Sequence, residues 1–242
     1  MNTRIDARPK SSAFTLIELL TVIAIIAILM ALLFPVIGSV RETAKKTQAK
    51  TDEMQIVAAV KAFNTEYGKY PNVDPTGTPP AAGTDTLVGD MKKGSSLAQQ
   101  PTVDNNALFN ILRSISDNSA NQTFTGNPRR IVFFEGKSVA NPASPKSGFL
   151  DNPNANGGGG NTTKGGFYDP WGTEYFVYID TDYDNQINVS QNYTDFPVTA
   201  SPQVGVAVFS LGKDQTIGSP SAGVTNMYKS GSNTSDDVIS WQ

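Results

Sequence analysis

Three aspartates alternate with other residues in the segment 180–187, which reads DTDYDNQI. This pattern matches the first half of an EF-hand-like loop, in which acids at positions one, three and five give oxygen ligands to calcium. Gln191, at position twelve, cannot supply the bidentate carboxylate of that loop. The alternative is a hydrated acidic turn between strands, although three neighbouring carboxylates repel one another unless a cation or their spacing relieves them. Asp180, Asp182 and Asp184 are therefore a candidate calcium site.

The composition leaves mainly oxygen chemistry. The 242 residues include no His and no Cys, which excludes imidazole catalysis, thiolate catalysis, disulfides and zinc sites of the usual donor types. With 19 Lys and Arg against 22 Asp and Glu, the formal charge of −3 argues against a nucleic-acid binder. Paired carboxylates serve as acid and base in glycosidases, but no feature of the sequence places two of them at a cleft. We therefore expect no enzymatic role.

One more carboxylate, Glu18, lies inside an apolar run. From Phe14 to Ile37 the chain reads FTLIELLTVIAIIAILMALLFPVI, which is long enough to cross a bilayer as a helix. An acid in such a helix costs about 2.5–3.5 kcal/mol near the bilayer centre and less near its edge. Glu18 either reaches the lipid headgroups or has a cationic partner. A free α-amino group on Phe14 would be such a partner if the chain were cut between Ala13 and Phe14.

Two other interpretations of the apolar run fit the sequence less well. A secretory signal has a shorter apolar core that precedes its small-residue cleavage site, whereas here the small residue Ala13 comes before the run. A buried core helix would carry a polar face, and this run has almost none. Basic residues stand on both sides of the run, so the charge distribution does not decide its orientation.

The helix is expected to continue beyond the membrane. Residues 38–67 contain no Pro, and apolar side chains recur on one face as far as Phe63 and Tyr67. Gly68 and Pro71 then supply the signal that ends the helix. The sequence thus predicts a membrane helix over 14–37 and its soluble continuation over 38–70.

Residues 71–242 are predicted to form a loop-rich head. A Pro-rich and Gly-rich loop over 71–103 precedes a short helix over 107–114, which Asn105 caps. Residues 130–135, RIVFFE, are predicted to form a strand. Residues 141–166, with four consecutive glycines, read as a flexible linker.

The last third of the chain holds the predicted sheet. Two apolar segments, Glu174–Asp180 and Val204–Leu211, are expected to be strands of an antiparallel meander, because polar turns separate them. A long helix packed on a small antiparallel sheet defines an α+β fold.

The stretch 13–19, AFTLIEL, resembles the class III signal of type IV prepilins and type II secretion pseudopilins. In that family a prepilin peptidase cuts before the Phe and methylates its new amino group. The resemblance therefore implies a cleaved leader over 1–13 and a processing site between Ala13 and Phe14, although the family usually has Gly in place of Ala13. It also implies that Glu18 pairs with the amine of a neighbouring subunit in a filament, and that Pro35 kinks the helix.

The head carries a second part of this resemblance. The segments DPWG (169–172), SLGKD (210–214) and DDVISW (236–241) look like the head of the major pseudopilin. The resemblance implies that Asp214, Asp236, Asp237 and the backbone carbonyl of Leu211 hold one calcium ion. The long insertion between Asp214 and Asp236 departs from the family pattern. It either adds ligands or disrupts the site.

The resemblance implies a structural subunit of a type II secretion pseudopilus that polymerises through its N-terminal helix to drive protein export. It would lie in the inner membrane with its head on the periplasmic side. Its partners would be further copies of itself, prepilin peptidase, the inner-membrane platform, minor pseudopilins and membrane lipid, but no nucleic acid.

Two alternatives stay open. One is a type IV pilin for adhesion, motility or DNA uptake. Many pilins close their C-terminal region with a disulfide, so the lack of Cys and the candidate calcium loop favour the pseudopilin. The other is a membrane-tethered, calcium-dependent binding module that never polymerises.

Overall fold

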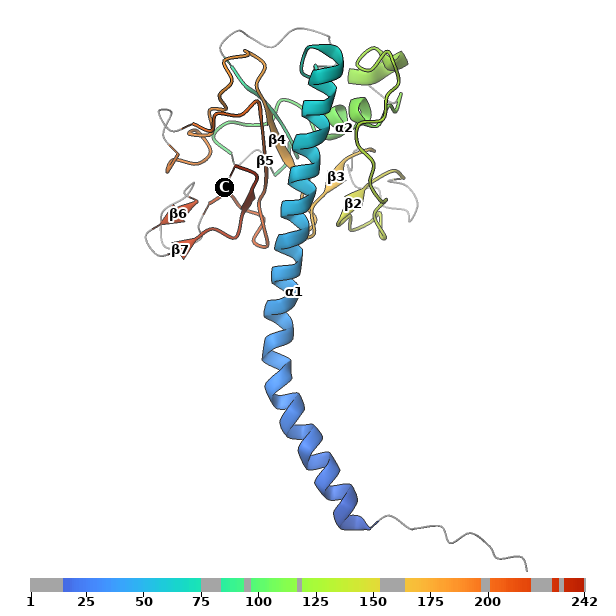
Figure 1. Cartoon of the computed structure of the whole chain (residues 1–242), viewed down its shortest axis with the longest axis vertical. Coiled ribbons are helices and arrows are strands. Elements are labelled where there is room, and N and C mark those ends of the chain that lie inside the picture. Colours follow the sequence, from blue (N-terminus) through green and yellow to red (C-terminus); the bar gives the residue numbers. More distant parts are fainter. Residues whose placement is uncertain are drawn as a thin grey trace, which may run out of the picture. The chain divides into compact units, whose positions relative to one another are not determined.

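The chain forms a long helix followed by a head built mainly from loops and short strands (Figure 1). The computed structural model describes residues 15–74, 84–93, 97–116, 119–152, 164–196, 201–218, 228–230 and 233–241. The chain divides into two compact units, and the boundary between them lies between Ala44 and Lys45 within the long helix. The predicted leader, residues 1–13, lies outside the described residues.

Helix α1 runs from Leu16 to Tyr67, which confirms the predicted long helix. It ends where Gly68 adopts a left-handed φ of 67° and donates its N–H to the Asn64 carbonyl at 2.7 Å. Every side chain from Leu16 to Phe34 is exposed. Further along, Ala49, Ile56 and Phe63 are buried in the head.

The core of the head is a four-stranded antiparallel sheet in the order β1-β4-β5-β8. Its strands are β1 (Thr86–Val88), β4 (Phe176–Ile179), β5 (Val206–Ser210) and β8 (Val238–Ile239). In the register, Thr86 lies opposite Ile179, Phe176 opposite Phe209, and Ser210 opposite Val238. The strands join their neighbours in chain order, so the predicted antiparallel meander of the two central strands is confirmed.

Both faces of this sheet are covered, because alternate side chains of each strand enter different apolar clusters. Val177, Ile179 and Val208 pack with the α1 side chains Ile56 and Phe63 in the first cluster. The opposite face enters a second cluster formed by Phe176, Tyr178, Phe209, Ile187, Tyr193 and Leu211, among others. The fold is α+β, with the second half of α1 packed on the sheet.

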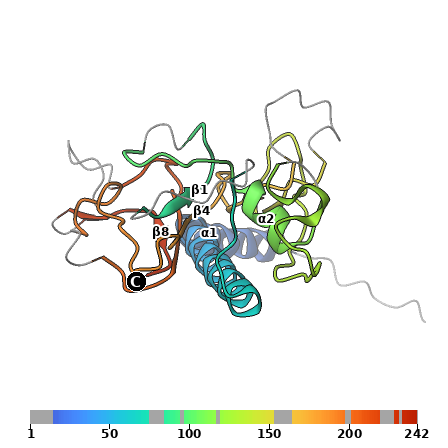
Figure 2. The same cartoon turned by 90° about the horizontal axis from the view of Figure 1, so that it is seen from above.

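Helix α2 (Asn106–Leu112) adds its buried side chains to the first cluster. In Figure 2, α2 and the sheet lie on opposite sides of the second half of α1. The hairpin of β2 (Gly148–Phe149) and β3 (Phe167–Tyr168) lies next to α2. The head also contains an irregular 3-10 stretch, η2 (Ser119–Phe124), and the short hairpin of β6 (Lys229–Ser230) and β7 (Asn233–Thr234).

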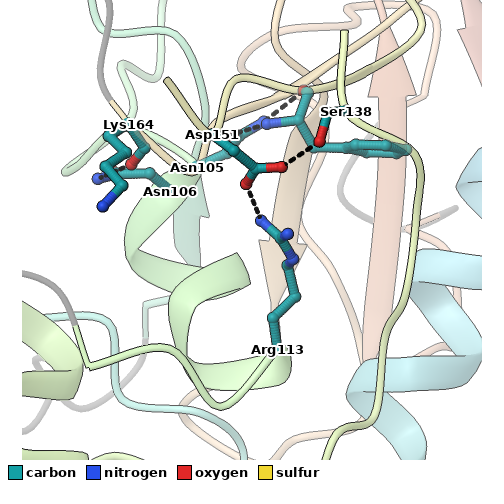
Figure 3. A network of polar contacts seen from close by, with 7 residues as sticks. Asn105, Asn106, Arg113, Ser138, Asp151 and Lys164 are labelled. Atoms are coloured by element: carbon teal, nitrogen blue, oxygen red, sulfur yellow. Dashed lines mark hydrogen bonds and ion pairs between the residues drawn. The ribbon is translucent and has the colours of Figure 1, made fainter. Parts of the chain in front are cut away.

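A polar network joins α2 to the β2–β3 hairpin (Figure 3). The Arg113 guanidinium donates to Asp151 at 2.8 Å and lies 3.8 Å over the ring of Phe149. The same Asp151 carboxylate accepts a hydrogen bond from the Ser138 hydroxyl. Burial opposes ionisation of Asp151, but the hydrogen bonds from Arg113 and Ser138 lower its pKa overall.

Four predictions about the head need correction. Residues 130–135 are not a strand: the N–H groups of Phe133 and Phe134 donate to the Leu112 carbonyl at the end of α2. The loop predicted over 71–103 contains the edge strand β1, and the linker predicted over 141–166 contains the buried strand β2. Asn105 precedes α2 as predicted, but its side chain does not cap the helix.

Asn105 instead joins β3 and the residue before β4 to the start of α2. Its side-chain amide donates to the carbonyls of Phe167 and Tyr175 at 2.9 and 3.1 Å, and its Oδ1 accepts the Phe167 N–H at 3.0 Å. Its backbone N–H donates to Glu174 at 3.2 Å. Burial, followed by the nearby Asp104 and Asp90, raises the pKa of Glu174 to about 8. A buried amide that satisfies strand backbone groups explains why this Asn is not available as a cap.

Candidate functional site

The first half of α1 is the first candidate site, because its apolar surface is uncovered. Among the described residues it is the part of the chain that is long and apolar enough to cross a membrane. Large side chains such as Ile17, Leu29 and Phe34 are 72%, 61% and 69% exposed. Apolar area of this extent is normally removed from water by lipid or by other protein surfaces.

Glu18 closes the first turn of this helix. Its Oε2 accepts the backbone N–H and the hydroxyl of Thr15, each at 2.8 Å, while the Glu18 N–H donates to the Thr15 hydroxyl at 3.3 Å. This reciprocal pair is a capping box, in which the N-cap threonine and the third helical residue satisfy each other's N–H groups. The capping box gives Glu18 a local structural role that the sequence analysis did not foresee.

The processing residues of the sequence analysis, Ala13 and Phe14, lie outside the described residues. The pairing of Glu18 with an amine therefore stays a prediction. Pro35 lies within α1, as expected for a proline of the apolar helix, and its kinking role also stays a prediction.

The second candidate site is the C-terminal acidic group, Asp214, Asp236 and Asp237. One carboxylate oxygen from each lies within 4.8 Å of the others. The pairing of β5 with β8 brings them together, since Asp214 follows β5 and the other two precede β8. Asp236 Oδ2 accepts the N–H groups of Lys213 and Asp214 at 2.6 and 3.0 Å, which fixes the turn to the segment before β8.

The C-terminal acidic group leaves two oxygens without partners. Asp237 is 3% exposed; its Oδ2 accepts from the Tyr193 hydroxyl at 3.0 Å and from the Gly218 N–H at 2.8 Å. Its Oδ1, and the Oδ1 of Asp236, are buried without a hydrogen-bond partner among the described residues. Burial and then the neighbouring Asp236 charge raise the pKa of Asp237 to about 7. Oxygen donors left unpaired beside like charges fit a bound cation such as calcium.

Leu211, whose carbonyl the family resemblance adds to this group, directly follows β5. Its side chain is buried in the second cluster, and Gly212 next to it has a φ of 66°. A Cβ at Gly212 would lie 2.5 Å from the Asp236 carbonyl, so the close approach of the two segments requires glycine there. The role of the Leu211 carbonyl as a ligand stays a prediction.

The third candidate site differs from the one predicted from sequence. Asp180 and Asp182 do approach each other, but the third member of their group is Asp85, at the start of β1. Asp184 lies outside this group and lines the adjacent cavity. Asp85 was missed because its place depends on the pairing of β1 with β4. The one available signal in the sequence was an acidic residue directly before the short segment TLV. An acid before a short apolar segment is too common a pattern to be informative.

The comparisons with known proteins match only part of this chain. Residues 8–34 match the family model described as the prokaryotic N-terminal methylation motif. The chain is 37% identical over 81 residues to type II secretion system core protein G of Pseudomonas aeruginosa, a match covering 30% of this chain and 57% of that protein. It is 39% identical over 62 residues to the type IV major pilin protein PilA of Myxococcus xanthus, covering 26% of this chain and 28% of that protein. No solved structure matches the chain.

The matches thus span about half of the first relative's length and about a quarter of the second's. Together with the long N-terminal helix and the four-stranded antiparallel sheet of the head, these matches place the chain in the type IV pilin-like family, which includes the pilins and the type II secretion pseudopilins.

Proposed function

We propose that the chain is a structural subunit of a type II secretion pseudopilus and that it polymerises through the first half of α1 to drive protein export. The observation that carries the proposal is the exposed apolar surface from Leu16 to Phe34, which has the Glu18 carboxylate in its first turn. Lipid would cover this surface before assembly, and the same segment of neighbouring subunits would cover it afterwards. The role is mechanical, so no substrate is turned over.

The assembly step follows from electrostatics. Prepilin peptidase would cut between Ala13 and Phe14 and methylate the new amine, which carries a positive charge. Glu18 of a neighbouring subunit would neutralise that amine inside the apolar filament core, where an unpaired charge is costly. Incorrectly staggered subunits would leave both charges unpaired, so the pair would also set the axial register. The head would then face the periplasm, with the helix anchored in the inner membrane.

The capping box gives a sharp test of this step. Glu18→Gln keeps the capping box, because glutamine serves at its third position, but it removes the charge. We expect this variant to be processed and membrane-inserted but unable to form filaments, as judged by electron microscopy of membranes from cells that express the assembly machinery. Thr15→Val is the matched control: it removes the hydroxyl of the capping box, keeps the carboxylate, and should still form filaments.

The opposite result, filaments from Glu18→Gln and none from Thr15→Val, would mean that capping and not charge pairing controls assembly. If neither substitution changed the filaments, Glu18 would have no assembly role. A membrane-tethered binding module would behave differently from any filament subunit, since the unmodified chain would stay monomeric at every concentration in detergent.

A type IV pilin is the second candidate, because the chain is also similar to a major pilin. Deleting the gene in its own cell separates the two. Loss of exported proteins from the medium with surface fibres retained supports the secretion role, whereas loss of fibres, adhesion or motility with export retained supports the pilus role. The more extensive match to a secretion core protein, together with a chain that has no Cys, favours secretion.

Calcium at the C-terminal acidic group is part of this proposal. Asp214, Asp236, Asp237 and the Leu211 carbonyl would hold the ion, which would offset most of the negative charge of the three acids and fasten β8 to β5. We expect a chelator to lower the thermal midpoint of the full chain in detergent by about 2–8 °C, the shift that a loss of about 1–2 kcal/mol gives in a domain of this size. Asp214→Asn should abolish this difference. A chelator effect that persists unchanged in Asp214→Asn would exclude Asp214 as a ligand.

A further inference from the structure

Two distant segments bring acids together at one end of the sheet, well apart in sequence from the C-terminal group. Strand β1 pairs with β4 so that Thr86 lies opposite Ile179, and this register sets Asp85 beside Asp180. Carboxylate oxygens of Asp85, Asp180 and Asp182 lie within 4.8 Å of one another. Thr86 and Thr181, whose hydroxyls are 3.1 Å apart, hold the same two segments together.

A cavity of about 180 Å³ opens beside these acids. All nine of its lining residues bear side-chain oxygen atoms and none of them is Lys or Arg; they include Asp85, Asp182, Asp184 and Ser201. Three of the nine are acids, so the described wall of the cavity supplies negative charge without a basic side chain to balance it. A space of this size holds one ion together with a few water molecules.

Two buried oxygens of this cavity have no partner. Ser201 is only 7% exposed, yet its hydroxyl makes no hydrogen bond with the described residues. Asp85 Oδ2 accepts the Asn188 N–H at 2.8 Å, but the Oδ1 of the same carboxylate is buried and unpaired. Buried polar atoms normally find a partner, so two unpaired oxygens on residues that line the same cavity point to a ligand that both can bind.

The loop after β4 is already folded for such a ligand. Tyr183 and Asn185 both adopt a left-handed φ of 62°, and Asp180 accepts their N–H groups at 2.6 and 3.0 Å. These contacts occupy one hydrogen-bonding position on each Asp180 oxygen, which leaves further lone pairs for a cation. The Tyr183 ring stacks on Tyr70, and its hydroxyl accepts the Tyr70 N–H at 3.1 Å, so the loop is fixed to the segment that follows α1.

We propose that Asp85, Asp180 and Asp182 bind a calcium ion, with Ser201 and the amide side chains of the cavity completing its oxygen ligands. Carboxylates, amides and hydroxyls with no nitrogen or sulfur donor suit a hard cation. Calcium takes six to eight oxygens in flexible geometry and fits an irregular cavity, whereas magnesium requires a near-ideal octahedron. The ion joins the edge strand β1 to the β4–β5 connection, and it does so whether or not the chain assembles into filaments.

Calcium titration calorimetry of the full chain in detergent, after removal of bound metal, tests the proposal. Four forms are compared: the unmodified chain, Asp85→Asn, Asp214→Asn and the double variant. We expect Asp85→Asn to lose about one calcium ion per chain and Asp214→Asn to keep the ion that Asp85 binds. If the C-terminal group binds nothing, the unmodified chain binds one ion and Asp85→Asn binds none, so the two sites are tested independently.

Thermal unfolding with and without calcium gives a second test. If Asp85 had a purely structural role, the effect of Asp85→Asn on stability would not depend on calcium. In chelator, Asp85→Asn should be at least as stable as the unmodified chain, because it removes charge repulsion from the cluster. With calcium, the unmodified chain should gain stability at this site and Asp85→Asn should not, so the order of stability of these two forms reverses. Asp90→Asn, the same change five residues along and outside the cavity, should lose no calcium and show no reversal.

Three results would overturn the proposal. Asp85→Asn could bind as much calcium as the unmodified chain with the same affinity. Asp214→Asn alone could abolish all calcium binding. Magnesium could bind the Asp214→Asn variant more tightly than calcium does, which would leave the cluster but exclude the assigned ion.

Discussion

The two halves of α1 have opposite relations to their surroundings. From Leu16 to Phe34 every side chain is exposed, and the apolar residues run all round the helix. From Ala49 to Phe63 one face of the helix, which carries Ile56, Val60 and Phe63, is buried against the sheet and α2, although Met54 is 52% exposed. The second half therefore has its partner in the same chain, whereas the first half has to find one outside it, in lipid or in other subunits.

Each half also carries a carboxylate on an apolar surface, and the surroundings of these two carboxylates differ. Glu18 in the first half accepts hydrogen bonds from Thr15 at the helix terminus, where backbone N–H groups favour negative charge. Glu53 in the second half is 0% exposed, and neither of its oxygens has a hydrogen-bond partner among the described residues. The charge of Glu18 is thus available to pair with a group of another molecule, whereas a charge on the buried Glu53 carboxylate opposes folding of the head.

The largest expected effect on stability distinguishes the two halves of α1 directly. Phe63 is 1% exposed and packs on Tyr67 and Phe133, with ring centroids 4.5 and 5.3 Å apart. Phe63→Ala should lower the free energy of unfolding of the head by about 3–5 kcal/mol. Ile23→Ala, in the exposed half, should change it by no more than about 0.5 kcal/mol.

Denaturant unfolding in detergent micelles, followed by tryptophan fluorescence, measures both changes. The two tryptophans of the chain, Trp171 and Trp241, both lie in the head, so the signal reports on the head alone. Similar losses from the two substitutions would contradict the comparison, because they would show that the first half of α1 supports the head.

The elements that the sequence predicted correctly are those with long or strongly apolar patterns. The end of α1 at Tyr67 follows from Gly68, and strands β4 and β5 follow from continuous apolar runs. Residues 130–135 are equally apolar but lack an adjacent strand edge, since their N–H groups bond to the end of α2. Strand β1 was missed because three residues carry little pattern, and its partner β4 lies about ninety residues further on.

The candidate sites show the same limit. Asp236 and Asp237 are next to each other in sequence, and Asp180 and Asp182 belong to one loop, so local pattern was enough to find them. Asp85 and Ser201 join the acidic group of Asp180 and Asp182 only through the pairing of β1 with β4 and the shape of the cavity. Local spacing cannot encode a contact of this kind, because the contact depends on which strands become neighbours.

The smaller expected effect sharpens the comparison at Glu53. Burial, and then the charges of Asp52, Asp169 and Asp237, raise the pKa of Glu53 well above its ordinary value, although the nearby Lys50 lowers it. A group whose pKa is raised on folding contributes stability that is complete below its unfolded pKa and is lost as the pH rises through its folded pKa. The stability of the head should therefore fall above about pH 4.5, by up to about 1.4 kcal/mol per pH unit for this one group.

Glu53→Gln tests this assignment, because the amide stays neutral at every pH and has nearly the same shape. We expect the variant and the unmodified chain to have similar stabilities near pH 4.5 and to diverge as the pH rises, with the variant more stable at pH 8. Glu135→Gln removes the same charge from the exposed surface of the head and should leave the profile unchanged. Parallel profiles for Glu53→Gln and the unmodified chain would mean that Glu53 has the same pKa in both states. The carboxylate would then need a cationic partner inside the head, and the second half of α1 would resemble the first in requiring a neutralising charge.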